Sequence, residues 1–359
     1  MTRPHACFGS ALCKAALVLF AGLAAPQAQA NDGFGGLSAT GLTFGQTDAI
    51  AMEEEDLFIG FDEIRVAYVF RNLTDRDVTG EVIFPLPPIP LNVLMMSEFN
   101  LPQDRSEPDL INFRATVDGQ DVPVTLDQIA VIEPSWTEER PASAYYDTPG
   151  TDVTAQLARF GLPVTVDVDQ VRAALAALPP SRLQDLVATG LVEAFTEGPP
   201  QTVDDVMPLW SVVSRYHWTQ TFPAGQVLRV AHRYDNRPPG GIFPWQDPPR
   251  EDWLQVTVAR YCVDPATSKG IARRLAASEQ DGMLTGMSWN ISYVLRTANS
   301  WAGPIGRFHL TIDKGSEQHI LSLCAEGLKK TGPTTFELER RNFTPEQDLE
   351  ILIVAPLGG

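Results

Sequence analysis

Most residue patterns that mark known catalytic sites are missing from this sequence. It has no P-loop, no HExxH pair and no CxxC pair. The glycine-rich stretch at Gly33 has serine where a dinucleotide fingerprint needs its last glycine, and the stretch from Gly286 to Asn290 lacks the final glycine of a nucleophile elbow. The sequence therefore predicts no catalytic residue, no cofactor-binding residue and no metal ligand.

Basic residues are in short supply. The chain has 27 Lys and Arg against 45 Asp and Glu, which gives a formal charge of −18. Nucleic acids and anionic lipids are bound by clustered Lys and Arg, so we expect no nucleic-acid partner. Acidity of this kind favours solubility.

Long apolar runs are missing beyond the first thirty residues. Arg3 and Lys14 precede an apolar run at residues 15–24, and residues 28–30 read Ala-Gln-Ala. A basic start, a short apolar core and a small-x-small ending are typical of a leader that signal peptidase removes. The run is about ten residues, and about 20 are needed to span a bilayer. We expect cleavage before Asn31, a periplasmic mature chain of formal charge −20, and no integral membrane segment after cleavage.

Cysteine is also scarce. Two of the four cysteines belong to the predicted leader, which leaves Cys262 and Cys324. In an oxidising compartment these two are expected to pair, and the alternative is a pair of buried free thiols. A bridge would close a loop of about 60 residues, worth about 4 kcal/mol in the chain-entropy model.

Alternating apolar residues dominate what is present. Residues 63–72 place Ile64, Val66, Tyr68 and Phe70 on one face, which predicts a half-buried strand. Similar patterns recur along the chain, and 29 prolines and 27 glycines suit short strands joined by turns. The fold class predicted is mostly β, with β-sandwich-like antiparallel modules and a short α-helical insert.

Helical spacing is confined to a few segments. Residues 151–197 are expected to form two or three short helices. Gly161 is predicted to end one of them, Asp167 to lie at the start of the next, and Ser181 to begin a capping box. A further helix is expected at 265–278, and a strand carrying Leu254, Val256 and Val258. The predicted division is a signal peptide at 1–30, an N-terminal antiparallel β module at 31–132, a linker and helical insert at 133–205, and a C-terminal β domain at 206–359.

Six of the seven tryptophans lie between residues 210 and 301. Clustered aromatic rings form either the core of a β domain or a stacking surface for sugars or proline-rich peptides. Trp245 and Trp301 stand in segments rich in glycine and proline, where function is more frequent. The candidate binding surface is therefore Trp245, Trp301, Asp313 and Lys314, of which the last two are either an exposed turn pair or part of a site.

Histidines offer one metal hypothesis. His217 and His232 fall on strands that flank the turn at Gly225, where two imidazoles facing each other across a hairpin would be able to share a metal. No third ligand is evident, so the favoured interpretation is a pair of surface or half-buried histidines.

Several short motifs together resemble one family. They include Phe84-Pro85-Leu86-Pro87-Pro88, Tyr261-Cys262-Val263-Asp264, Trp301-Ala302-Gly303-Pro304-Ile305 and Asp313-Lys314-Gly315. With these the chain resembles bacterial domain-of-unknown-function family 4424 over essentially the whole mature sequence. The resemblance implies an exported protein and supplies no activity. Residues 63–126 also resemble the VIT-type β module found beside von Willebrand A domains, but the Asp-x-Ser-x-Ser metal site of that partner domain is absent.

These observations favour a non-catalytic periplasmic β protein that binds another molecule or takes part in envelope assembly. Its expected partner is an envelope protein or a glycan. The alternative is a hydrolase directed at glycans or peptidoglycan, or a carbohydrate-binding module, which the Trp-rich loops and surplus carboxylates motivate.

Overall fold

The structure is a computed structural model, and it describes residues 33–38, 41–44, 48–96, 100–135 and 149–358. Strands make up 42% of it and helices 21%, so the protein is mostly β with a short helical part, as predicted. The predicted leader and its cleavage point before Asn31 lie outside the described residues. Within those residues, no helix combines the length and the apolar character needed to cross a membrane.

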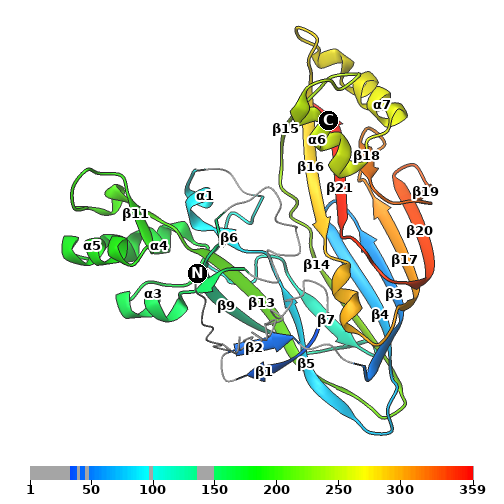
Figure 1. Cartoon of the computed structure of the whole chain (residues 1–359), viewed down its shortest axis with the longest axis horizontal. Coiled ribbons are helices and arrows are strands. Elements are labelled where there is room, and N and C mark those ends of the chain that lie inside the picture. The colour runs from blue at the N-terminus through cyan, green and yellow to red at the C-terminus, as the bar shows by residue number, and fades with distance from the viewer. Residues whose placement is uncertain (1–32, 39–40, 45–47, 97–99, 136–148, 359) are drawn as a thin grey trace, which may run out of the picture.

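The largest sheet joins strands from distant parts of the chain (Figure 1). In order, its strands are β19 (Lys329–Lys330), β20 (Thr335–Phe343), β17 (Ile305–Asp313), β3 (Ile50–Ile59), β4 (Glu63–Asn72), β14 (Val227–Asp235), β7 (Arg114–Val117) and β8 (Gln120–Asp121). Strands β17 and β3 are parallel and the other neighbours are antiparallel. Both predicted β modules therefore contribute to this sheet, while the domain boundaries stay a prediction.

A second sheet packs against the large one. In order, its strands are β10 (Thr151–Asp152), β9 (Thr125–Ile132), β13 (Ser211–Phe222), β5 (Val78–Pro85), β1 (Gly33–Ser38) and β2 (Gly41–Phe44), and β6 (Ile89–Pro90) also pairs with β13. Phe70 of β4 meets Phe222 of β13 edge to face, with ring centroids 5.8 Å apart. Phe84 of β5 lies 5.2 Å from His232 of β14. The two sheets thus form a sandwich, and the term "sandwich" below means this pair.

Strand β4 shows why these sequences form half-buried strands. Ile64, Val66, Tyr68 and Phe70 are all buried, and Arg65 between them is exposed. Successive side chains of a strand point to opposite faces, so one face joins the core while the other meets solvent. The predicted alternation over residues 63–72 is confirmed.

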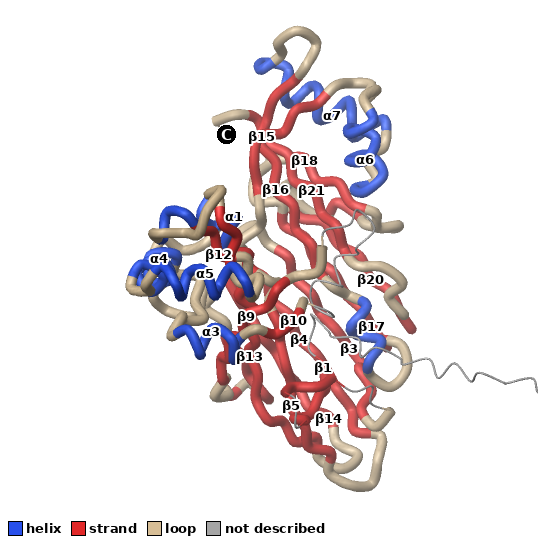
Figure 2. Tube along the Cα trace, turned by 60° about the vertical axis from the view of Figure 1, so that its left-hand side comes forward, coloured by secondary structure: helices blue, strands red, loops and turns tan. Residues whose placement is uncertain are grey.

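The helical part of residues 151–208 lies to one side of the sandwich (Figure 2). It contains α3 (Thr154–Phe160), α4 (Val168–Ala176), α5 (Pro180–Ala188), the 3-10 turn η1 (Val203–Asp205) and the two-stranded sheet of β11 (Val192–Ala194) and β12 (Val206–Pro208), and α1 (Leu91–Met96) packs nearby. Gly161 ends α3 with φ 71°, and Asp167 caps α4, both as predicted. The predicted capping box at Ser181 is wrong, because Pro180 occupies the first helical position and Ser181 is already inside the helix.

A third sheet carries two helices at the other end of the molecule (Figures 1 and 2). Its strands, in order, are β15 (Gly240–Trp245), β16 (Leu284–Tyr293), β21 (Leu349–Pro356) and β18 (Ile320–Leu323), and its helices are α6 (Asp252–Tyr261) and α7 (Pro265–Leu275). On β21, Ile351 and Ile353 join the main core, while Leu352 and Val354 join a smaller core under the helices. Both faces of this sheet are therefore covered, and we call it the covered sheet.

The strand predicted around Leu254 is wrong, because this segment is helix α6. Leu254 and Tyr261 are buried on one face with Val258 partly buried between them, at helical spacing, whereas Val256 is 67% exposed. Three residues at alternate positions fit both a strand and a helix, and only the wider spacing separates them. The helix predicted at 265–278 is confirmed as α7 followed by the 3-10 turn η2 (Ala276–Ser278).

Cys262 and Cys324 form a disulfide, as predicted, with Cα atoms 5.0 Å apart. Cys262 ends α6 and Cys324 directly follows β18, so the bridge ties a covering helix to the sheet beneath it.

Candidate functional site

The two loop tryptophans proposed as stacking residues lie in the interior. Trp245 is 0% exposed in the smaller core, with its ring 5.5 Å from that of Phe243. Trp301 is 2% exposed in the main core, 4.5 Å from Phe70. A sugar ring would reach either indole only if the core opened. The glycine and proline around them predict loops, but Trp245 ends strand β15 and Trp301 follows the 3-10 turn η3 (Arg296–Ser300).

Asp313 and Lys314, the other two predicted site residues, begin a turn between β17 and β18. We call residues 313–319 the β17–β18 loop. The Oδ1 of Asp313 accepts a hydrogen bond from the N–H of Gly315 at 2.9 Å. The buried Nζ of Lys314 donates to the carbonyl of Glu317 at 3.2 Å and to that of His319. These two side chains therefore fix the shape of the loop, whereas Trp301 and Trp245 are buried in two different hydrophobic cores.

One side of this loop meets a group of partly exposed rings. His319 lies 5.9 Å from Phe61 and 5.8 Å from Trp289, and the last two rings meet edge to face at 5.0 Å. Gly240 of β15 lies against the indole of Trp289, where an added Cβ would come within 2.5 Å of Cδ1. The loop is therefore held against both the large sheet and the covered sheet.

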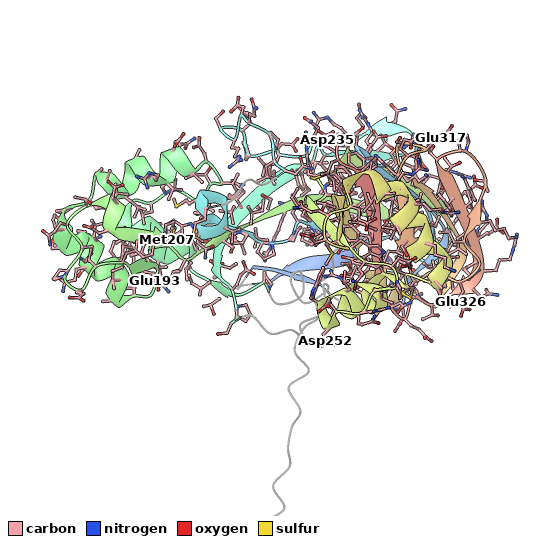
Figure 3. All side chains as sticks on the ribbon, turned by 90° about the horizontal axis from the view of Figure 1, so that it is seen from above. Glu193, Met207, Asp235, Asp252, Glu317 and Glu326 are labelled. Carbon is pink, nitrogen blue, oxygen red and sulfur yellow. A yellow bond between two sulfur atoms is a disulfide. The ribbon has the colours of Figure 1, made fainter. Side chains whose placement is uncertain are left out.

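The other side of the loop borders an open hollow of about 460 Å³. This is within the usual size range of small-molecule sites. Its lining comes from α7, the loop, β18 and the end of β21, and consists of Gly270, Arg273, Arg274, Gln318, Ile320 and Pro356. We call it the α7 hollow. In Figure 3 the loop residue Glu317 lies far from Glu193 and Met207 of the helical part.

Local sequence explains how α7 presents these groups. Asp264 caps the helix by accepting from the N–H of Thr267 at 2.6 Å, and Pro265 is its first residue. Ile271 and Leu275 are buried against the covered sheet. Gly286 on β16 permits this close approach, since a Cβ there would lie 2.7 Å from a methyl group of Leu275. The arginines of the last turn consequently face away from the sheet.

Positive charge gathers around the hollow. Arg274 donates to the side-chain oxygen of Gln318 across it. Burial lowers the pKa of the Lys314 ammonium, and the nearby charges of Lys330 and Arg274 lower it further, while Glu317 and Asp313 act in the opposite direction. Lys314 therefore lies close enough to Lys330 and to Arg274 to be repelled by each, in a chain whose formal charge is −18.

The predicted histidine pair is not brought together as partners in a hairpin ladder. His217 lies on β13 of the second sheet, between Glu81 at 3.4 Å and Asp127 at 3.1 Å. His232 lies on β14 of the large sheet, buried among aromatic rings. The two strands follow each other in sequence but pair with different sheets. Among the described residues, no group of three or more His, Cys, Asp or Glu side chains is placed to hold a metal ion.

The residues of the α7 hollow were not predicted as a site. Gly270, Arg273 and Arg274 are close in sequence, but Gln318 and Pro356 come from elsewhere in the chain, and only the fold assembles them. One signal was available: a glycine in the middle of the predicted helix, followed by an arginine pair in an acidic chain.

Comparisons with known proteins give a family and no activity. The family model described as "Domain of unknown function (DUF4424)" matches residues 30–352. Among solved structures, one similar chain is a Legionella pneumophila protein named a "putative nutrient binding protein", with a TM-score of 0.41 and 14% identity, over 90% of this chain and 72% of that one. No curated protein matches.

Proposed function

The chain belongs to the DUF4424 family, and on that premise we propose that it is an exported protein that binds a small molecule in the α7 hollow without transforming it. The observation that carries the proposal is the hollow itself. It is an open space of about 460 Å³ that combines two charged guanidinium groups, an amide and apolar walls. Ligand sites are typically concave, with apolar walls and a few polar groups that fix orientation.

The lining of the α7 hollow favours binding over catalysis. Its polar side chains are those of Arg273, Arg274 and Gln318, and no carboxylate, hydroxyl, thiol or imidazole lines it. A guanidinium stays protonated in proteins, and an amide neither gains nor loses a proton near neutral pH. These groups hold and orient a ligand, whereas general acid–base or nucleophilic catalysis needs groups of other kinds.

Two features support export to the periplasm as part of the proposal. The first is the leader pattern that ends before Asn31. The second is the disulfide between Cys262 and Cys324, because such bridges persist in oxidising compartments. Expression of the full chain with its own leader in a Gram-negative host tests this. We expect periplasmic protein whose intact mass corresponds to residues 31–359, and a cytoplasmic chain that retains its leader would contradict export.

A ligand screen tests binding in the α7 hollow. The mature protein is heated with panels of metabolites, glycans, peptidoglycan fragments and divalent metals. A ligand at 100 times its dissociation constant should stabilise the protein by about 2.7 kcal/mol. We expect a small molecule to raise the melting temperature in the unmodified chain.

A matched pair of glycine variants locates the ligand. Gly270→Leu places a side chain in the hollow, where the nearest atom to an added Cβ is a methyl of Ile320 at 4.0 Å. Gly198→Leu adds the same side chain where nothing lies within 4 Å, far along the chain. We expect the shift to disappear in Gly270→Leu and to persist in Gly198→Leu. A shift that survives both substitutions would place the ligand elsewhere, and no shift with any panel member would refute the proposed function.

A further inference from the structure

We propose that the α7 hollow recognises a small anion, a carboxylate or a phosphate group, through Arg273 and Arg274. This inference rests on the proposed function, because it names the ligand class of the same site. A guanidinium presents its N–H donors in a rigid fork that matches the oxygen atoms of both groups.

The two arginines have no carboxylate partner among the described residues. Some other arginines do have an acid partner, as Arg260 has Glu350 at 2.8 Å and Arg307 has Glu54 at 3.1 Å. Among the described residues neither Arg273 nor Arg274 has an acid within 4.0 Å, and the hydrogen bond of Arg274 goes to the neutral amide of Gln318. Their positive charge is therefore left for a ligand to neutralise.

The remaining polar group of the lining complements the same ligand. Arg274 donates to the side-chain oxygen of Gln318, which orients the amide and leaves its two N–H groups as donors. The buried ammonium of the loop residue Lys314 lies near enough to Arg274 for the two positive charges to interact. Every polar side chain of the lining is thus a donor or holds a donor in place, which suits an acceptor-rich ligand.

Gly270 explains how the hollow stays open. A glycine in a helix interior is less favourable than alanine by about 0.5–1 kcal/mol. The space beside Gly270 is empty out to the methyl of Ile320 at 4.0 Å, so packing does not require the residue to be small. A helix that accepts this penalty beside two arginines keeps room for a ligand, and Ile320 and Pro356 form its apolar walls.

Arginines near a helix C-terminus also have a purely structural role, because they interact favourably with the helix dipole. Arg159, in the last turn of α3, has that position and does not line the α7 hollow. The structural role predicts equal consequences for Arg159→Gln and Arg274→Gln. The binding role predicts that only the α7 variants lose a ligand.

Calorimetric titration of the mature protein, residues 31–359, makes the test. The probes are inorganic phosphate, succinate and glucose, each at the same ionic strength set with sodium chloride. We expect phosphate or succinate to bind and glucose not to bind. Arg273→Gln and Arg274→Gln should each weaken binding about tenfold or more, since each removes charge-assisted hydrogen bonds, while Arg159→Gln should leave it unchanged. Whether phosphate or succinate binds more tightly separates the two sources of the anion.

Three outcomes would overturn the inference. Equal weakening by Arg159→Gln would show a general effect of charge on the molecule. Binding of glucose with no response to the arginine variants, but with loss in Gly270→Leu, would refute the anion and leave the proposed function standing. If neither anion binds but the panel screen has found another ligand in the hollow, the anion is likewise refuted and the proposed function stands.

Discussion

The sandwich and the covered sheet are stabilised in different ways. The sandwich buries its strands in one large core, in which aromatic rings from the large and second sheets interlock. The covered sheet has only a small core of its own, and a disulfide between Cys262 and Cys324 reinforces it. The comparison indicates that the sandwich supplies stability, whereas the covered sheet supplies a helix, α7, whose outer face is free to line a site.

The largest expected effect comes from truncating one tryptophan in each region. Trp301→Ala should cost about 3–5 kcal/mol of unfolding free energy, because it removes a large ring from the main core. Trp245→Ala should cost less, since it also removes a buried indole N–H that has no acceptor among the described residues. Urea unfolding followed by circular dichroism measures both. Equal losses of unfolding free energy would contradict the comparison, because they would show that the smaller core contributes as much to stability as the main core.

The disulfide provides the next largest effect. Breaking it should lower the stability by about 2–4 kcal/mol, because the bridge closes a loop with a sequence separation of 62 residues. Hydrogen exchange should quicken in α6, α7 and the covered sheet, while β4 and β13 of the sandwich keep their protection. The double variant Cys262→Ser, Cys324→Ser should have the stability and exchange rates of the reduced protein. Added reductant should change neither quantity in this variant. Faster exchange throughout the sandwich would mean that the covered sheet is not a separate unit of stability.

Local sequence patterns predict many of the individual strands and helices, but they do not predict which strands pair with one another. The alternation at residues 63–72 predicts β4 because one face of that strand is buried and the other is more exposed to solvent. Nothing local indicates that β17 lies parallel to β3, some 250 residues away. The segment at Leu254 was misread because alternate apolar residues over five positions fit either a strand or a helix.

The candidate site was harder to predict than the fold. Asp313 and Lys314 are predictable from the sequence as a charged pair in a turn, and they shape the β17–β18 loop that borders the hollow. Trp245 and Trp301 have glycine- and proline-rich surroundings, which predict loops but do not indicate whether a side chain is buried. Gln318 joins Arg274 only because α7 packs beside β18, a tertiary contact with no trace in sequence spacing.

Gly270→Ala separates stability from binding within the covered sheet. Alanine is the better helix former, so the variant should gain about 0.5–1 kcal/mol of stability if its methyl group fits the empty space. The same methyl narrows the α7 hollow, so ligand affinity should fall. Thermal unfolding and titration of the same preparation measure the two quantities. A loss of stability would show that the helix needs glycine for packing, and unchanged affinity would show that the ligand does not approach Gly270.

The smallest effect concerns acid and the start of α7. The backbone N–H of Thr267 bonds to the carboxylate of Asp264 and holds the pKa of this exposed group below its usual value. A depressed folded-state pKa means that the cap stabilises the protein fully above the ordinary aspartate pKa, near 4, and loses that contribution as the pH falls through the folded value. Asp264→Asn retains a capping oxygen that does not titrate, so its hydrogen-exchange protection in α7 should vary less between pH 5 and pH 3 than that of the unmodified chain. Asp264→Ala should lower protection of α7 at both pH values. The hydrogen-exchange protection of the sandwich strands should be the same in all three proteins. A sandwich that responds to these variants as strongly as α7 would show that the helix cap is coupled to the whole fold, and would remove the distinction between a stabilising region and a region that carries the site.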